Sequence, residues 1–189
     1  MPFGRPKKQA APLDEAALYE YAAKSLGRRM RTESELRRLM QAKVERPGSD
    51  SDTGATKIAA VIARLKEYGY LDDTQFAETF TRLRQENEKL GQRRVRQALG
   101  QKGVASKIVD QAIDARYSQI NEETLAREHL ERKRIRKPEN EKETARVMRR
   151  LVTAGFSTGV IYKILRQWDV PDEALAALEN LEESSETEE

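Results

Sequence analysis

Apolar residues recur at spacings of three and four along most of this chain, the period that places them on one face of an α-helix. The first such segment covers residues 13–29, and the second starts at Thr32, a good N-cap residue. A third runs over 58–68 and meets Gly69, where a left-handed C-cap is expected. The pattern predicts three helices, with the breaker-rich stretch 46–54 as a loop before the third.

The same pattern then occurs twice more. Asp72 is a second N-cap candidate, and it opens a set of three helical segments that ends near Tyr117, with Gly103 after the middle one. A further set extends to Trp168, with Gly155 after its middle segment and Ser157 as the expected N-cap of its last. Nine helices in three sets of three is the simplest interpretation.

A direct alignment supports a true internal repeat. When the chain is shifted by 52 residues, apolar residues align with apolar residues and a glycine aligns with a glycine. The aligned pairs are Val95 with Val147, Leu99 with Leu151, Gly103 with Gly155, Val104 with Phe156, Ile108 with Val160, Val109 with Ile161, and Ile113 with Leu165.

We therefore predict an all-α protein of three tandem three-helix repeats, elongated and curved. The expected boundaries are a disordered segment 1–12, a first repeat 13–71 containing the loop 46–54, a second repeat 72–118, a third repeat 119–171, and an acidic tail 172–189.

Composition agrees with a modular helical protein. Charged residues make up 35% of the chain and hydrophobic residues 38%, which is too few apolar residues for one thick core. With no cysteine, disulfides and thiolate metal sites are excluded, and no apolar run is long enough to cross a bilayer. A monomeric, cytoplasmic protein without a membrane contact is expected.

Charge is unevenly distributed along the chain. The net charge is +3, but residues 172–189 carry eight carboxylates and no Lys or Arg, so residues 1–171 carry +11. A basic body favours a polyanionic partner such as nucleic acid, or an acidic protein surface. The alternative is an ordinary charged helical protein with a solubilising tail.

Basic clusters lie around the junction of the first and second helices of each set. Such clusters can neutralise phosphates or bind carboxylates, although solvated helix faces also carry runs of Arg and Lys. The candidate contact residues are Arg28, Arg29, Arg31, Arg37, Arg38, Arg84, Arg93, Arg94, Arg96, Arg132, Lys133, Arg146, Arg149 and Arg150.

Catalytic motifs are missing from the sequence. When Leu125-Ala126 is placed on Phe76-Ala77, so that the first helices align, the single histidine, His129, falls on Phe80 of the apolar seam. It is expected in the core or at its boundary, which leaves no transition-metal site. No phosphate-binding loop motif occurs, and the Asp72–Asp73 pair lies where an N-cap explains it. A non-enzymatic protein without cofactor or metal is predicted.

The segment GYLDDTQFA, from Gly69 to Ala77, resembles the signature of the RecX family of recombination regulators. Further residues of each helix set are similar to the family. They are Tyr21, Ala22, Leu26, Arg28, Arg29, Thr32, Glu35 and Leu36 in the first set, Gly91, Arg94 and 99–103 in the second, and 149–151, Gly155, Phe156 and Ile161 in the third. The resemblance covers about 13–168, whereas the loop 46–54 and the tail after 172 depart from the family pattern.

The resemblance implies three tandem three-helix repeats that bind RecA filaments along their helical groove. It also implies inhibition of RecA's ATPase, strand exchange and coprotease activities, with DNA contact in some members. Two alternatives stay open: a helix-turn-helix-like DNA-binding protein that acts without RecA, and a scaffold for another acidic protein. The third helix of each set is the least basic, which disfavours a sequence reader.

Overall fold

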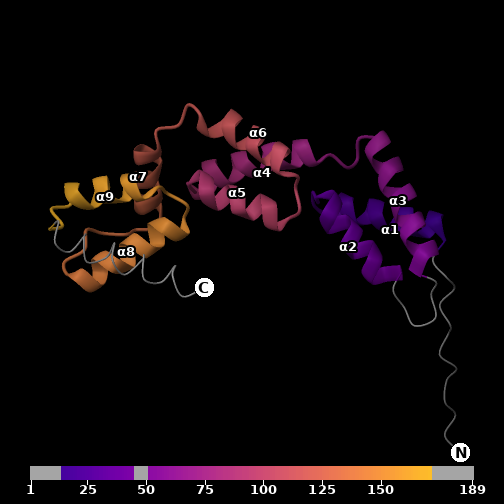
Figure 1. Ribbon diagram of the computed structural model, residues 1–189, viewed down its shortest axis with the longest axis horizontal. Helices are drawn as coiled ribbons and strands as arrows, with labels where there is room; N and C mark the ends of the chain where they lie inside the picture. The colour runs from indigo at the N-terminus through magenta and orange to yellow at the C-terminus, as the bar shows by residue number, and fades with distance from the viewer. Residues whose placement is uncertain (1–13, 45–50, 172–189) are drawn as a thin grey trace, which may run out of the picture. The chain divides into compact units, whose positions relative to one another are not determined.

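The computed structural model describes residues 14–44 and 51–171, and within these ranges it contains helices and no strand. The helices are α1 (Glu15–Arg28), α2 (Glu33–Val44), α3 (Ser51–Glu67), α4 (Asp73–Glu88), α5 (Gln92–Gln101), α6 (Ser106–Tyr117), α7 (Glu122–Arg132), α8 (Glu141–Thr153) and α9 (Thr158–Gln167) (Figure 1). The predicted all-α fold class is confirmed. The predicted disordered segment 1–12 and the acidic tail lie outside the described residues.

Side-chain caps begin several helices where the sequence predicts them. The Thr32 hydroxyl accepts a hydrogen bond from the Glu35 amide at 3.1 Å, and Asp72 accepts from the amides of Thr74 and Gln75. These bonds satisfy backbone donors that have no partner inside the helix. At the other end of α3, Gly69 has φ +70°, as a left-handed cap requires.

The prediction that Ser157 is the N-cap of the last helix is confirmed, although its side chain bonds elsewhere. Ser157 occupies the N-cap position of α9, but its side chain makes no capping bond. Instead, its amide and its hydroxyl both donate at 2.7 Å to the carboxylate of Glu122 in α7. A charged acceptor from a neighbouring helix forms a stronger bond than the local backbone can, so the serine joins α9 to α7.

The loop predicted for residues 46–54 is shorter in the structure, because α3 already begins at Ser51. Residues 45–50 lie outside the described ranges. Gly54, which the sequence suggested as a breaker, lies within α3 and is buried. A Cβ atom at Gly54 would stand 2.5 Å from Cγ1 of Val44, so the glycine permits the close approach of α2 and α3.

The chain divides between Phe76 and Ala77 into two compact units. In the first unit, α1, α2 and α3 pack against one another. The core of this unit is formed by completely buried residues of all three helices: Leu18, Ala22, Leu36, Met40, Val61 and Leu65.

The second unit contains two helix sets, which we term the second set (α4–α6) and the third set (α7–α9). In the third set, α9 packs against both α7 and α8 (Figure 1). Its core is formed by Leu125, Met148, Leu151, Phe156, Ile161, Ile164 and Leu165. Leu90, Tyr117 and Ile120 of the second set and its linker pack against that core, so the two sets share an apolar contact.

Positions that align in the 52-residue repeat have similar environments. Leu99 and Leu151 are both completely buried, and Gly103 and Gly155 both have positive φ, at +76° and +90°. The residue after each glycine donates its amide to the aligned leucine carbonyl at 3.2 Å. The middle helices α5 and α8 therefore end in the same turn.

Candidate anion-binding groove

Helix α8 separates its apolar and basic residues on opposite faces. Val147, Met148 and Leu151 are buried in the core, while the cationic side chains one turn apart on the other face are exposed. Those cations are Arg146, Arg149 and Arg150. Because residues three and four apart lie on one side of a helix, burial of the apolar stripe directs the three guanidinium groups outward together.

Helix α5 of the second set begins where α8 ends. The Gly91 amide donates to the Ala154 carbonyl at 2.9 Å, and a Cβ atom on Gly155 would overlap the backbone of Arg94. Only glycine at these positions allows the two backbones to come so close. The contact brings Arg94, in the first turn of α5, beside the arginines of α8.

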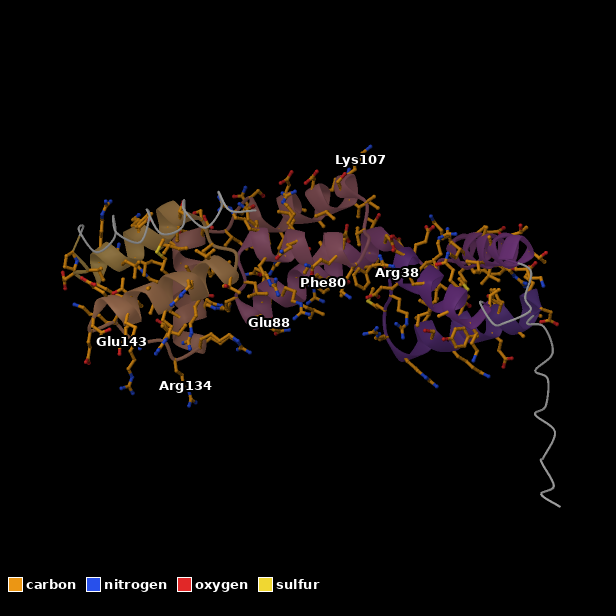
Figure 2. The ribbon with its side chains drawn as sticks, turned by 60° about the horizontal axis from the view of Figure 1, so that its bottom comes forward. Arg38, Phe80, Glu88, Lys107, Arg134 and Glu143 are labelled. Carbon is orange, nitrogen blue, oxygen red and sulfur yellow. The ribbon has the colours of Figure 1, made fainter. Side chains whose placement is uncertain are left out.

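After α8 and the start of α5, a third side of the groove is formed by α7 and the turn after it. Lys133 follows α7, and Arg134 has φ +53°, which turns the chain so that the Ile135 amide donates to the Leu130 carbonyl at 2.9 Å. Figure 2 shows the labelled Arg134 and Glu88 on the same side of this unit. This turn holds Lys133 and Ile135 opposite the exposed face of α8.

His129 of α7 connects this wall to the end of α4. It is 4% exposed, its Nδ1 lies 3.1 Å from the Glu88 carbonyl oxygen, and its ring meets Phe156 edge-on at 5.7 Å. Burial lowers the pKa of His129 and outweighs its hydrogen bond to the Glu88 carbonyl, which raises it. The imidazole is therefore neutral near pH 7, with Nδ1–H donating to the carbonyl.

Together these elements surround a cavity of about 650 Å³ that we call the basic groove. Five cationic side chains line it: Arg94, Lys133, Arg146, Arg149 and Arg150. Leu90, Ile135 and Ala154 add apolar surface. The only carboxylate in its lining is that of Glu88, which already forms an ion pair with Arg84.

Within the ranges 14–44 and 51–171, none of the five cations forms an ion pair with a carboxylate. Five like charges around one depression repel one another and attract anions, and the surrounding protein screens them less than water does. Arginine can hold a phosphate or carboxylate through two parallel hydrogen bonds. The basic groove is suited to bind a polyanion.

The other predicted contact residues of the second unit lie outside the groove lining. Arg84 pairs with Glu88 and stacks over the Phe80 ring at 4.8 Å, and Arg96 pairs with Asp110. Arg93 and Arg132 are exposed.

Of the five predicted contact residues in the first unit, two have partners inside the fold and three are exposed. Arg37 forms an ion pair with Glu33 at 2.8 Å, and Arg31 donates from Nε to the Ser25 carbonyl at 3.5 Å. The remaining three, Arg28, Arg29 and Arg38, are exposed.

Sequence reasoning did not predict the apolar residues that line the groove, nor that His129 lines it. It correctly placed His129 in the core, because the residue aligns with Phe80, but it gave no reason to place that core position beside a groove. The available signal was the pair Gly91 and Gly155. Gly91 precedes α5 and Gly155 follows α8, so glycine at both places permits a close contact between the two backbones.

Among the residues that the structure describes, no cluster of side chains is arranged to hold a metal ion. In the same part of the chain, no helix is long and apolar enough to cross a membrane.

Comparison with known proteins matches the sequence and the fold of this chain to one family. The family model for the second three-helix domain of RecX matches residues 72–113. The regulatory protein RecX of Salmonella paratyphi A is 33% identical over 156 residues, which cover 81% of this chain and 92% of that protein. That of Oceanobacillus iheyensis is 30% identical over 151 residues, or 78% of this chain, but the match spans about half (52%) of the longer relative.

Solved structures support the fold. A crystal structure of a regulatory protein RecX superposes with a TM-score of 0.62 at 22% identity, covering 81% of this chain and 71% of the other. RecX from Lactobacillus salivarius gives 0.59 at 21% identity, covering 82% and 96%. The sequence identity to the Salmonella protein and the matching helical fold lead to one conclusion: this chain belongs to the RecX family.

Proposed function

We propose that this protein is a negative regulator of the RecA recombinase. It binds the RecA–DNA filament and inhibits RecA's ATPase, strand exchange and coprotease activities without catalysing a reaction itself. It acts as a monomer in the cytoplasm, in DNA repair, recombination and the SOS response. Its three repeats, 13–71, 72–118 and 119–171, each add basic residues to the contact.

The observation that carries the proposal is the basic groove. Its five cations have no carboxylate partner among the described residues, so binding an acidic surface or a phosphate does not first require breaking an internal ion pair. A RecA–DNA filament offers both kinds of anion along its length. Family membership supports a regulatory role, and the absence of a metal cluster from the described residues gives no support to catalysis.

DNA binding without RecA is the second candidate, because phosphates alone also fit the groove. The third helix α6 disfavours a sequence-reading mode, since its exposed face carries Asp110 and Asp114, which repel the phosphates beside a DNA groove. DNA binding measured with and without RecA separates the two candidates.

The test is inhibition of RecA's DNA-dependent ATPase by the wild-type chain and by the variant R146E/R149E/R150E. We expect the variant to need at least about tenfold more protein for half inhibition, equivalent to ~1.4 kcal/mol. Circular dichroism checks that both chains are equally helical. A folded triple variant that inhibits as well as wild type excludes the groove as the contact.

A charge-matched pair gives the control. Arg149→Glu and Lys107→Glu each change the net charge by the same amount, but Lys107 is exposed on α6 and lies outside the groove lining (Figure 2). We expect Arg149→Glu to weaken inhibition and Lys107→Glu to leave it nearly unchanged. If both weaken inhibition equally, overall charge rather than the groove attracts RecA.

A further inference from the structure

The chain carries its own acidic segment directly after the last described residue. Residues 172–189 contain Asp172 and seven glutamates with no Lys or Arg. The basic groove presents five cations that no described carboxylate neutralises. The two opposite charges belong to the same molecule, so they meet at a high effective concentration whatever the protein concentration is.

The point where this segment leaves the structure is fixed near α8. The Val170 amide donates to the Leu165 carbonyl at 3.2 Å, and the neighbouring Asp169 forms an ion pair with Lys137 at 2.8 Å. Pro171 then borders a second cavity, of about 670 Å³, together with Thr144 of α8. The acidic segment therefore starts beside the first half of α8.

The basic groove lies within reach of that point. Along α8, Arg150 is six residues after Thr144, or about 9 Å by helix rise. Lys142 is exposed on α8 one helical turn before Arg146, which lines the basic groove. An extended segment of 18 residues can span roughly 60 Å, so reach does not limit the contact.

The apolar residues match as well as the charges. The groove contains Leu90, Ile135 and Ala154 beside its cations. The segment contains Leu175, Leu178 and Leu181 among its carboxylates. A polyanion such as DNA provides charge but little aliphatic surface, whereas this segment provides both, and burial of aliphatic groups adds to the attraction.

We propose that residues 172–189 bind in the basic groove of the same molecule and compete with its anionic partner. The competition rests on the function proposed above, since the partner must use the same groove. The contact itself does not depend on that function. Removal of the negative charge from the segment then exposes the groove and strengthens partner binding.

The direct test uses the full-length chain without RecA or DNA. The chain has no cysteine, so Ser184→Cys gives a single site for a nitroxide label within the acidic segment. At about 20 mM salt we expect the backbone amide signals of Arg149 and Arg150 to lose more than half their intensity through paramagnetic broadening. Those of Val104 and Ser106, which follow the end of α5 that points away from the groove, should keep most of theirs. At about 0.5 M salt the difference should largely disappear.

A matched variant shows whether charge causes the contact. Replacement of Asp172 by Asn and of the seven glutamates by Gln alters no described residue, so the fold of 14–171 cannot be the reason for a change. We expect this neutral-tail variant to lose the selective broadening. If broadening at the groove persists in it, or never exceeds that at Val104 in the wild-type chain, the proposal is wrong.

Two further measurements separate the remaining outcomes. In a mixture of labelled chain and unlabelled isotope-enriched chain, broadening as strong as within one chain would mean that a second copy supplies the segment, which overturns the proposal. In the RecA ATPase assay, we expect the neutral-tail chain to inhibit at severalfold lower concentration than wild type. If neither chain inhibits RecA, the proposed function fails while the broadening result stands.

Discussion

Helices α5 and α8 occupy equivalent positions in the second and third helix sets, but they use their arginines differently. Both bury a valine and a leucine four residues apart, and both end at a glycine with positive φ. On α8, three exposed arginines face the basic groove without a described carboxylate partner. On α5, Arg94 donates to Gln97 at 2.9 Å and Arg96 is paired with Asp110.

The difference originates in the third helix of each set. Asp110 of α6, which holds Arg96, aligns with Tyr162 of α9 in the 52-residue repeat, so the third set has no carboxylate at that place. The position that aligns with Arg96 is Met148, which is 1% exposed in the core. A basic cluster in the sequence therefore does not indicate how many cations are available, because the answer depends on a residue in another helix.

The first helices show a second difference. Phe80 in α4 lies beneath Arg84 and Lys102, with the lysine nitrogen 5.8 Å from the ring centre. His129, the aligned residue of α7, instead contacts the backbone of α4 through the Glu88 carbonyl. Thus the second set stacks cations on its aromatic ring, and the third set uses its ring to hold the neighbouring set in place.

The largest expected effect concerns the contact where α8 ends and α5 begins. Gly155→Ala places a side chain at φ +90° and against the backbone of Arg94, and we expect it to lower the free energy of unfolding by about 3 kcal/mol. Chemical denaturation followed by circular dichroism measures the change.

Gly100 in α5 provides the matched control. A Cβ atom at Gly100 would meet nothing within 4 Å, and the residue lies within the helix, so Gly100→Ala should stabilise the protein by up to ~1 kcal/mol. Equal effects of the two substitutions would contradict the close backbone contact that forms one end of the basic groove.

An intermediate effect is expected from the pH dependence of His129. Burial lowers the pKa of His129 below its ordinary value of 6.5, so protonation favours the unfolded chain. Its contribution to stability is complete above pH 6.5 and is lost as the pH falls through 6.5 toward the lowered pKa. The slope for one proton is at most ~1.4 kcal/mol per pH unit.

The measurement is the free energy of unfolding of wild type and of His129→Gln at several pH values from neutrality down to about 5.5, where side chains with ordinary carboxylate pKa values remain mostly ionised. His129 is the only histidine in the chain, so the slope should flatten in the variant. An equal slope in both proteins would show that another group titrates and that the ring is not held neutral by burial.

The sequence was sufficient for the fold because local signals agreed with one another. The residue types at Thr32 and Asp72 predict N-caps, and both make capping bonds; Gly69 ends its helix with the predicted positive φ. The apolar period identifies the core face of each helix. Where a distant residue decides the outcome, sequence reasoning was wrong or incomplete. Ser157 occupies the predicted N-cap of α9, but its hydroxyl binds Glu122 of α7. Gly54 was expected in a loop, but it lies inside α3, where a Cβ would meet Val44.

The candidate site was predicted only in part for the same reason. Five of the predicted cations line the basic groove, but the sequence could not distinguish them from Arg31, Arg37, Arg84 and Arg96, which have partners inside the fold. Pairing depends on contacts between helices that the linear pattern does not contain. We regard the five groove residues, Arg94 among them, as the first choice for mutagenesis, ahead of Arg93 and Arg96 on α5.

The smallest expected effect tests the comparison between α5 and α8 directly. Asp110→Asn keeps the size of the side chain but removes the carboxylate that pairs with Arg96, and both partners are about half exposed. An exposed ion pair is worth ~0–1 kcal/mol, so the free energy of unfolding should change little. The released arginine then adds one free cation to α5.

We expect Asp110→Asn to bind DNA, or to inhibit RecA, about two- to threefold more strongly than wild type at low salt, because one repulsive carboxylate is lost and one guanidinium is freed. Asp114→Asn is the matched control, since Asp114 is also exposed on α6 but its carboxylate forms no ion pair among the described residues. If both substitutions strengthen binding equally, the loss of negative charge explains the effect. If only Asp110→Asn does so, pairing with Asp110 is what keeps α5 from using its arginines as α8 does.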